Sequence, residues 1–407
     1  MSYAYRGSRN SSVANRFART KTGQRRSNQP KRNARRGQYI DPARFVKAAT
    51  PVAAEAYEQQ HLFTDFLLDD LLKQNLANKG YVQPSPIQDQ SIPLALNGQD
   101  VIGIASTGTG KTAAFALPAL QHLLSGTRKA ALIIAPTREL AQQIEDECKA
   151  LARGSGLFGT LLIGGASMNN QLRDLQRRPR IIIGTPGRIK DHLKRGSLAL
   201  HNFDLVVLDE VDRMLDMGFV NDVTEILSHL HENRQSLFFS ATMDTRVRKL
   251  IDVFTTNPAT ISLKPSSTSD NVHQDVIRYQ TSTEKMDRLH DLLVREDVSK
   301  IIIFDATQRS VERLAKELVA RGFVADSIHG GKTQGQRQRA LTKFKKDDIK
   351  ILVATDVAAR GIDVADISHV INYTLPQSYD DYIHRIGRAG RAGREGYALT
   401  FVTNESF

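Results

Sequence analysis

Cysteine and tryptophan are nearly missing from this chain: one cysteine, Cys148, and no tryptophan occur in 407 residues. A single cysteine excludes an intrachain disulfide, which argues against a disulfide-stabilised secreted module and favours a reducing compartment. Cys148 lies in a helical pattern, so we expect it to pack rather than to react. No apolar run approaches the roughly 20 residues of a membrane-spanning helix, and no secretory signal follows Met1. We therefore expect a cytoplasmic protein without a membrane partner.

Acidic residues are missing from the first 40 positions. This stretch holds eleven Lys and Arg residues and leaves 45 basic against 44 acidic residues elsewhere, so the net charge of +12 belongs mainly to one end. Such a polar composition cannot bury enough apolar surface to order itself, so residues 1–57 are predicted to form a disordered basic tail. Cations that neutralise phosphates release counterions, which suits contact with nucleic acid. A merely solvated tail and an organelle transit peptide are the alternatives.

The remaining sequence predicts an α/β protein with two domains in tandem. Aliphatic runs that suit strands buried on both faces of a parallel sheet alternate with helical patterns. In the first half the expected strands lie at 101–105, 131–136, 181–186, 205–210 and 236–242. In the second half they lie at 300–307, 323–330, 350–356, 369–375 and 397–403. A polar stretch with Pro and clustered Ser and Thr predicts a linker over 263–275, between domains at 58–262 and 276–407.

Residues 101–112, VIGIASTGTGKT, join a predicted strand to a predicted helix. Glycines in such a loop let backbone N–H groups turn toward one point, and the helix N-terminus adds partial positive charge there. Lys111 would reach the β- and γ-phosphates of a nucleotide, and the Thr112 hydroxyl would bind Mg²⁺. Ala105 stands where the generic phosphate-loop pattern has glycine. A plain glycine-rich turn is the alternative.

Two carboxylates, Asp209 and Glu210, end the strand predicted at 205–210. In open α/β sheets, ligands sit at the carboxyl ends of strands. Asp209 could hold Mg²⁺ there, and Glu210 could orient or deprotonate an attacking water. The alternative is a cluster that caps the helix that follows.

The segment 384–391, HRIGRAGR, gathers three arginines and a histidine. Arg388 and Arg391 can face one anion and act as arginine fingers, which contribute about 10³–10⁵ to the rate of phosphoryl transfer. A solvated basic turn and direct nucleic-acid contact are the alternatives. Because the segment lies in the second domain, an ATP site shared with Lys111 would have to form between the domains.

From about residue 62 to its end, the sequence resembles the DEAD-box RNA helicases of helicase superfamily two. The family motifs occur in order: residues 80–88 with Phe63 before them, 105–112, 136–140, 164–165, 185–188, 209–212, 240–242, 304–307, Gln334 with Arg337, 354–363 and 384–391. In this family the phosphate loop begins with Ala, which accounts for Ala105. The resemblance implies two RecA-like domains that bind ATP and Mg²⁺.

The resemblance also implies roles for single residues. Catalysis would fall to Lys111, Asp209, Glu210, Arg388 and Arg391. The nucleotide would contact Ser106, Thr107, Gly108, Thr109, Gly110, Lys111, Thr112, Gly361 and Asp363, while Gln88 reads the adenine edge and Tyr81 stacks on its face. Thr112 and Asp209 would hold Mg²⁺. Ser240 and Thr242 would couple the site to RNA through Asp212 and His384. Backbone and 2′-hydroxyl contacts to RNA would come from Arg138, Gly164, Gly165, Thr185, Arg188, Arg337 and Thr355.

Two features depart from the family pattern. The signature tetrapeptide has Val211 where the family has Ala. The two extra methyl groups carry no charge, so metal chemistry should be retained, although overpacking could cost about 1–3 kcal/mol in a pocket made for Ala. The chain also ends at Phe407, where the family usually continues with a helix. An exposed apolar face and a fragment of a longer protein are both compatible with that end.

We therefore predict a monomeric ATP-dependent RNA helicase. RNA-stimulated ATP hydrolysis would unwind short duplexes locally or remodel RNA–protein complexes, with structured or ribosomal RNA as candidate substrates. An ATP-gated RNA clamp with little turnover, a small-molecule kinase with a phosphate loop and a DNA helicase are the alternatives. Glu210, Arg388 and Arg391 argue against the clamp, and the kinase leaves the second domain unexplained.

Overall fold

The computed structural model describes residues 40–49, 57–106, 108–263, 271–295, 297–359, 364, 366–390 and 395–404. Most of the predicted tail and the middle of the predicted linker lie outside these ranges. Four predicted site residues also lie outside them: Thr107, Gly361, Asp363 and Arg391. Within the described part, the named strands form two sheets, and each pairing between them is parallel. No helix in this part is both long enough and apolar enough to cross a membrane.

The first sheet has the strand order β3-β4-β2-β5-β6-β1-β7. Its strands are β1 (Val101–Ile104), β2 (Ala131–Ile134), β3 (Gly159–Leu162), β4 (Ile181–Gly184), β5 (Leu205–Leu208), β6 (Gln235–Ser240) and β7 (Ala259–Ser262). The five aliphatic runs predicted in this half all form strands. In β2, β4, β5 and β6 every residue is buried, which is why these runs show no polar alternation.

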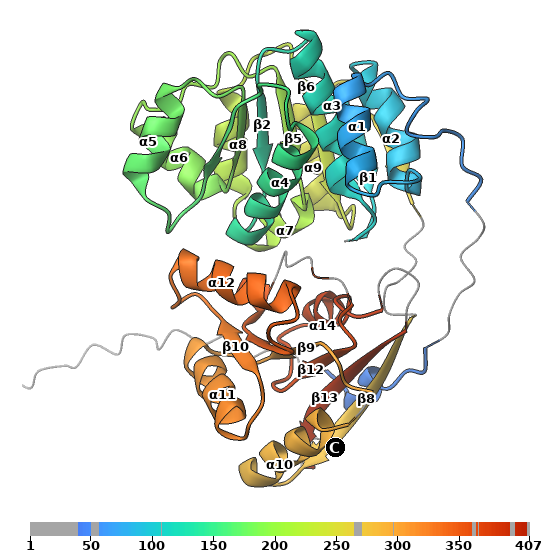
Figure 1. Ribbon diagram of the computed structural model, residues 1–407, viewed down its shortest axis with the longest axis vertical. Helices are drawn as coiled ribbons and strands as arrows, with labels where there is room; N and C mark the ends of the chain where they lie inside the picture. The colour runs from blue at the N-terminus through green and yellow to red at the C-terminus, as the bar shows by residue number, and fades with distance from the viewer. Residues whose placement is uncertain are drawn as a thin grey trace, which may run out of the picture. The chain divides into compact units, whose positions relative to one another are not determined.

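Helices cover both faces of the first sheet (Figure 1). One face packs against α1 (Asp70–Asn78), α2 (Pro86–Leu96), α3 (Lys111–Ser125) and α4 (Arg138–Leu151). The other face packs against α6 (Pro186–Lys194), α7 (Val211–Asp216), α8 (Val220–Ser228) and α9 (Thr245–Phe254). The helix α5 (Met168–Gln176) lies beside β3.

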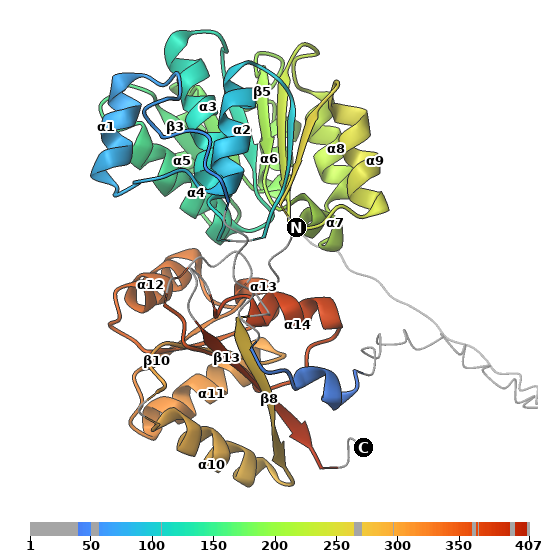
Figure 2. The same cartoon turned by 90° about the vertical axis from the view of Figure 1, so that its right-hand side faces the viewer.

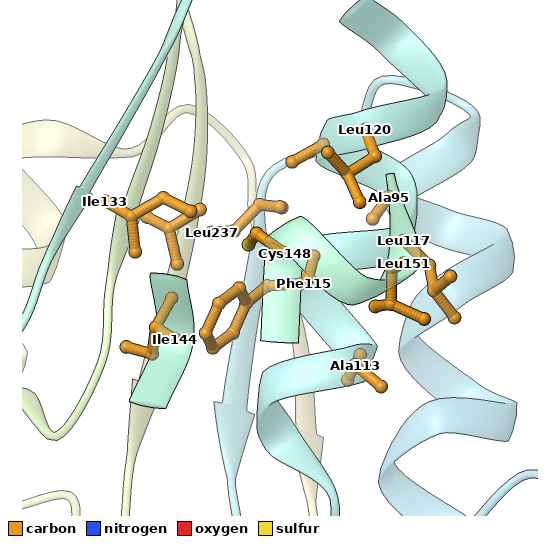
Figure 3. Packing of buried hydrophobic residues seen from close by; sticks show 14 of the residues in the cluster. Ala95, Ala113, Phe115, Leu117, Leu120, Ile133, Ile144, Cys148, Leu151 and Leu237 are labelled. Atoms are coloured by element: carbon orange, nitrogen blue, oxygen red, sulfur yellow. The ribbon is translucent and has the colours of Figure 1, made fainter. Parts of the chain in front are cut away.

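Cys148 belongs to the apolar core on the α1–α4 face. Figure 3 shows it on α4 among Phe115, Ile144, Leu151 and Leu237. Its side chain is buried, and this burial raises the pKa of the thiol to about 12. The prediction that Cys148 packs in the core is therefore confirmed.

The second sheet has the strand order β10-β11-β9-β12-β13-β8. Its strands are β8 (Val272–Tyr279), β9 (Ile301–Phe304), β10 (Ala325–Ile328), β11 (Ile351–Ala354), β12 (His369–Asn372) and β13 (Gly396–Thr403). One face packs against α10 (Ser282–Leu293) and α11 (Gln308–Ala320), and the other against α12 (Gln334–Lys345), α13 (Asp356–Ala359) and α14 (Tyr379–Ile386). The prediction of two tandem parallel-sheet domains is confirmed.

The end of the predicted linker is corrected by β8. Residues Val272 to Asp275 are not linker, because they pair in parallel with Gly396 to Leu399 of β13. Buried and more exposed positions alternate at the start of β8, and half of an edge strand of this kind is polar. Taken alone, the polar sequence of β8 therefore predicts a loop, and only the pairing with β13 shows that it is a strand.

The end of the predicted tail is corrected as well. Residues 40–49 lie on the second domain, beside α14 and β8 (Figure 2). They include a short 3₁₀ helix, η1 (Pro42–Phe45), in which Phe45 is fully buried. The prediction rested on the mostly polar composition of the tail, which gave no weight to Phe45 or to Ile40, whose side chain packs against the same core.

Candidate functional site

The carboxyl ends of the parallel strands bring the predicted residues of the first domain to one edge of the sheet. Along this edge, β3, β4 and β2 precede the predicted RNA contacts, whereas β5, β6 and β1 precede the predicted catalytic, coupling and phosphate-loop residues. Because all seven strands run parallel, these two groups occupy neighbouring parts of the same edge. The order of the strands in the sheet differs from their order in the chain, because β6 lies between β5 and β1 in the sheet but follows both in the chain. The sequence alone therefore did not show which predicted residues are neighbours.

The phosphate loop leaves β1 and enters α3, as predicted. Lys111 is the first residue of α3 and is buried, and its Nζ donates to the Ala105 carbonyl at 2.9 Å. The Thr109 hydroxyl donates to the Ser106 carbonyl at 2.9 Å. Gly110 has a φ of +91°, a conformation that L side chains rarely adopt. These contacts hold the loop in a turn around the Lys111 ammonium group.

Gln88 supports this loop directly. Its Nε2 donates to the Gly110 carbonyl at 2.9 Å, and its Oε1 accepts from the Ser85 backbone N–H at 2.9 Å. A Cβ atom at Gly110 would lie 2.5 Å from the same Nε2, so a larger residue there would displace the Gln88 side chain from this bond. The role of Gln88 at the adenine edge stays a prediction. The same holds for Tyr81, whose hydroxyl donates to Glu147 at 2.8 Å and whose ring meets Phe63 edge-on at 5.7 Å.

Asp89, next to Gln88, is a buried junction that the sequence alone did not single out. Its carboxylate accepts from the Tyr57 hydroxyl at 2.8 Å and the Gln60 backbone N–H at 2.8 Å, and it lies 2.7 Å from His61 Nδ1. Burial would raise the pKa of Asp89, but the donors from Gln60, Tyr57 and His61 hold it below its usual range. This junction fixes the segment before α1 against the N-terminal turn of α2.

Asp209 and Glu210 follow β5 and are both buried. Burial, with Glu210 as a neighbouring negative charge, raises the pKa of Asp209 to about 7, although Lys111 opposes the shift. Burial would also raise the pKa of Glu210, but Arg213, Lys111 and Arg388 lower it to about 2. The Arg213 guanidinium lies 2.5 Å from Glu210 Oε2 and was missed by sequence reasoning. Glu210 is therefore an ionised carboxylate in a site shared with Lys111.

Hard oxygen donors in this region fit Mg²⁺. Asp209 supplies a carboxylate whose pKa is raised mainly by burial, and Thr112, one residue after Lys111, supplies a hydroxyl. Among the described residues, no group of three or more His, Cys, Asp and Glu side chains could hold a metal alone. The donor set suits an ion that keeps several waters and binds substrate phosphates, as Mg²⁺ does.

Asp212 ties the end of β5 to the end of β6. Its Oδ2 accepts from the Thr242 backbone N–H at 2.9 Å, the Thr242 hydroxyl at 3.1 Å and the Ala241 backbone N–H at 3.1 Å. The Asp212 backbone N–H donates to Ser240 Oγ at 3.2 Å. Three of the four predicted coupling residues are thus joined by hydrogen bonds, and Val211 before them is fully buried in the core of the α6–α9 face.

Arg138 lies against the Gly164–Gly165 pair, three residues that were predicted to contact RNA. A Cβ atom at Gly165 would lie 2.5 Å from Arg138 Nη1, and the φ of Gly165 is +79°. A side chain at this position would collide with the guanidinium group and strain the backbone. The positive φ of Gly165 therefore favours glycine there, and a side chain on either glycine would displace the Arg138 guanidinium group.

Gln171, on α5, links the other predicted RNA contacts of this domain. It is buried, and its Nε2 donates to the Ile163 carbonyl at 3.0 Å, just before the glycine pair. Its Oε1 lies 3.3 Å from Arg188 Nη1 and 3.1 Å from His192 Nε2. Arg188 also donates to the Ala166 carbonyl at 3.4 Å. Sequence reasoning missed Gln171, because a single glutamine in an amphipathic helix carries no motif signal.

In the second domain, the structure separates two arginines that the sequence had grouped. Arg385 is buried, and its Nε and Nη2 lie 2.5 and 2.8 Å from the two carboxylate oxygens of Asp356. It also donates to the Thr374 carbonyl at 2.7 Å, so it joins α14 to α13 and to the end of β12. Arg388, one turn later, lines a small pocket with His384 and Asp356. Arg385 is therefore structural, and Arg388 remains the candidate finger.

Two more predicted RNA residues follow strands of the second sheet. Arg337 lies in the first turn of α12 and is buried, and its Nη2 lies 2.7 Å from Glu139 Oε1 on α4. Thr355 follows β11, is 9% exposed and accepts the first backbone hydrogen bonds of α13 from Ala358 and Ala359. Thr185, in the first domain, likewise precedes a helix, α6. Their contact with RNA stays a prediction.

Family models cover most of the two domains. The DEAD/DEAH box helicase model matches residues 85–250, and the helicase conserved C-terminal domain model matches residues 284–393. The first match spans the phosphate loop, Asp209–Asp212 and Ser240–Thr242, and the second spans α12 and α14. The two matches agree with the two sheets.

Relatives and solved structures are similar over most of the chain. The ATP-dependent RNA helicase CshA of Limosilactobacillus reuteri is 43% identical over 84% of this chain and 69% of its own length. The DEAD-box ATP-dependent RNA helicase CshA of Bacillus cereus is 44% identical over 84% of this chain and 65% of its own length. This chain thus spans about two thirds of each relative.

Among solved structures, S. cerevisiae Dbp5 bound to RNA and ADP BeF3 is 30% identical, with a TM-score of 0.75 over 85% of this chain and 90% of that chain. Mss116p bound to ssRNA and AMP-PNP is 31% identical, with a TM-score of 0.74 over 83% of this chain and 73% of that chain. With both family models matched in sequence order and both sheets parallel, the chain belongs to the DEAD-box family of ATP-dependent RNA helicases.

Proposed function

We propose that this chain couples RNA-stimulated ATP hydrolysis to the local unwinding of short duplexes or the remodelling of RNA–protein complexes. One observation carries the proposal: the predicted RNA contacts and the predicted ATP contacts share one edge of the first sheet, and the hydrogen bonds of Asp212 lie on the ATP side of it. A phosphate-loop kinase for small molecules leaves the second parallel-sheet domain unexplained. The structural relatives named above were solved with RNA and a nucleotide analogue.

The residues of the phosphate loop and of β5 would act together on ATP. Lys111 exchanges its bond to the Ala105 carbonyl for the β- and γ-phosphates, and the backbone N–H groups around Gly110 bind the phosphate oxygens. Glu210 is held in place by Arg213 and orients the attacking water. Thr112 and Asp209 would hold Mg²⁺, which would supply positive charge beside the phosphates.

The second domain would complete the site with Arg388 and Arg391. Arg385 and Asp356 fix α14, so Arg388 begins from a defined position when the two domains close over ATP. RNA on Arg138, Arg188, Arg337 and Thr355 favours the same closed arrangement. A strand bent by this surface no longer fits a duplex, which separates a short helix locally.

The wider assignments are part of the same proposal. The chain acts as a monomer on structured or ribosomal RNA, and the basic tail adds contacts to RNA phosphates without base specificity. Eleven cations in a stretch without acidic residues support the tail assignment.

The test is ATP turnover with a panel of RNAs against matched DNAs, for the wild type and for Glu210→Gln. We expect RNA to stimulate turnover and Glu210→Gln to reduce it by about 10²-fold or more, because water positioning and proton transfer contribute on that scale. Glu232→Gln, at an exposed position, is the matched control. If the Glu210→Gln variant turns over ATP at the wild-type rate, Glu210 does not orient the attacking water. Stimulation by DNA equal to that by RNA would favour a DNA helicase, and ATP-dependent RNA retention without turnover would favour a clamp.

A further inference from the structure

Residues 40–49 form a strap, named so here, on the second domain. Phe45 is fully buried in the core on the α12–α14 face, together with Val272 of β8 and Tyr382 of α14. The Phe45 and Tyr382 rings lie 4.6 Å apart between centroids and are tilted by 56°. A side chain with no exposed area in a core shared with a sheet and a helix is an integral part of that domain.

The backbone of the strap is paired as well. The Lys47 N–H donates to the Gln274 carbonyl at 2.9 Å, and the Gln274 N–H donates to the Lys47 carbonyl at 2.8 Å, which makes an antiparallel bridge. The Ala49 N–H lies 3.3 Å from His273 Nδ1. Because β8 is an edge strand, the strap occupies backbone groups that a sheet edge otherwise leaves open.

The contacts of the strap converge on the first turn of α14. The Arg44 guanidinium carbon lies 3.8 Å from the centroid of the Tyr379 ring. The Tyr382 hydroxyl donates to Gln274 Oε1 at 2.9 Å, so the residue that pairs with the strap backbone also holds the helix. Three separate interactions therefore fix the two tyrosines of α14: aromatic packing, cation–π contact and a buried hydrogen bond.

The far end of α14 leads into the predicted ATP-contacting residues. His384 lies in its last turn, and Arg388 is the second residue after the helix, with its Nε donating to the His384 carbonyl at 3.4 Å. A helix held only at its C-terminal end by the Arg385–Asp356 pair can still pivot, whereas a helix held at both ends cannot. The strap contacts of Phe45 and Arg44, together with the Tyr382–Gln274 hydrogen bond from β8, attach the other end.

We infer that the strap positions α14, and through it Arg388, for ATP hydrolysis, with Phe45 as its anchor. Phe45 is a positioning residue, since it acts only through Tyr382 and the helix. The inference rests on the proposed function in one respect, the role of Arg388 at the ATP phosphates. The inference assigns a role in the reaction to residues 40–49. These residues precede the first family-model match, which begins at residue 85, and were predicted to be part of the tail.

The experiment compares full-length Phe45→Ala with Phe45→Leu and Val46→Ala, well below the unfolding temperature of each. Val46 is the matched control, because it lies in the same strap and is 54% exposed. We expect Phe45→Ala to lower the RNA-stimulated kcat by about tenfold or more, since a displacement of about 1 Å can cost roughly 10²-fold. The KM for ATP should stay nearly unchanged, because the phosphate loop and Gln88 belong to the first domain. Phe45→Leu should restore most of kcat, and Val46→Ala should behave as the wild type.

Hydrogen exchange gives an independent readout. Amides of residues 379–386 should lose protection in Phe45→Ala while those of α3 keep theirs. A variant with a lower unfolding temperature but wild-type kcat and wild-type protection of α14 would overturn the inference. If Phe45→Ala fails to fold, the variant Arg44→Ala at an exposed position should show a smaller loss of kcat and of amide protection in α14. Wild-type kcat and protection in Arg44→Ala would then overturn the inference. If the wild type shows no RNA-stimulated turnover, the proposed function fails, while the exchange measurement still decides whether the strap holds α14.

Discussion

Glu210 combines a strained backbone with a strongly shifted carboxylate. Its φ of 54° and ψ of 55° lie in the left-handed region, immediately before α7. For a residue other than glycine, this conformation costs roughly 1–3 kcal/mol and persists only where the surroundings impose it. Here the Glu210 N–H donates to Asp209 Oδ1 at 3.0 Å, and Arg213 pairs with the side chain. The protein thus gives up some stability to hold this carboxylate in one position, as the proposed role of Glu210 in orienting water requires.

Asp212→Asn should separate RNA stimulation from ATP binding. The aspartate accepts three hydrogen bonds from Ala241 and Thr242, and bonds to a charged group contribute about 1.5–3 kcal/mol each. We expect RNA stimulation of turnover to fall by roughly tenfold or more, with a nearly unchanged affinity for nucleotide. Turnover with and without RNA, together with nucleotide titration, measures both effects.

The control for this change is Asp252→Asn, at an exposed position of α9. If Asp212→Asn keeps full RNA stimulation, the bond network between β5 and β6 does not transmit the RNA signal. An equal loss of nucleotide affinity would instead indicate a collapsed ATP site.

Glu312, on α11, predicts a measurable pH dependence of stability. The Ser327 hydroxyl donates to its carboxylate at 2.7 Å, and with His329 and Lys332 it lowers the pKa of Glu312 to about 2 against the opposing effect of burial. A lowered pKa stabilises the folded state above the unfolded value of 4.5, and the stabilisation is lost as the pH falls toward 2. The destabilisation caused by Glu312→Gln in urea unfolding should therefore be full at neutral pH and should shrink below about pH 4.5.

Glu317→Gln, on the exposed side of the same helix, serves as the control. A difference between the wild type and Glu312→Gln that stays constant from neutral to acidic pH would contradict the assignment. Since the Glu312 side chain is 37% exposed, solvent screening keeps the effect below that of a buried pair.

At the scale of elements, α5 and α6 depend on one glutamine. Gln171→Leu should leave the Ile163 carbonyl and His192 without their partner and release Arg188, which costs about 1–3 kcal/mol of stability for a buried polar group. We expect RNA affinity to fall several-fold and nucleotide affinity to stay unchanged. RNA titration and thermal unfolding of the full chain measure the two effects.

Gln176→Leu is the matched change on the same helix, because Gln176 is exposed. Should Gln171→Leu lower the unfolding temperature without weakening RNA binding, Gln171 would support the fold alone. Wild-type behaviour in both assays would mean that Arg188 keeps its position without this bond.

The sequence predicted those strands whose residues are apolar throughout, because such a run indicates a buried strand even when the neighbouring strand is not known. Runs such as residues 181–184 and 301–304 are aliphatic throughout, since both faces of each strand are buried. By contrast, β3, β7 and β8 were missed. They contain more polar or small residues than the predicted runs, and each lies at an edge of its sheet, where fewer positions are buried.

For the whole molecule, the strap adds a second connection between the domains, because the chain after it leads to the first domain and the packing of Phe45 attaches it to the second. Ala49 and Tyr57 are eight residues apart, as are Leu263 and Asn271, so each segment spans at most roughly 29 Å. The first segment joins the strap to the Asp89 junction beside Gln88, and the second joins β7 to β8. Docking of Phe45 therefore keeps both connections short, whereas its release would leave only one.

The basic tail makes a prediction at the same scale. Deleting residues 1–37 removes eleven cations but leaves the strap in place. RNA binding should weaken, and the slope of log affinity against log salt should decrease by up to about 0.7 for each cation that contacts a single strand. Filter binding over a series of salt concentrations measures the slope. An unchanged slope would show that the tail does not contact RNA.

The sequence by itself determined the class of fold, the phosphate loop, the carboxylate pair and the family, because each depends on local pattern and ordered spacing. Only the tertiary structure decided which side chains support these residues. Arg213, Gln171 and Arg385 act through contacts with other side chains. The hydrophobic periodicity of helices and strands carries no information about such contacts. The same holds for the strap. Phe45 looks like one aromatic residue in a polar tail until the folded second domain provides the apolar site that buries it.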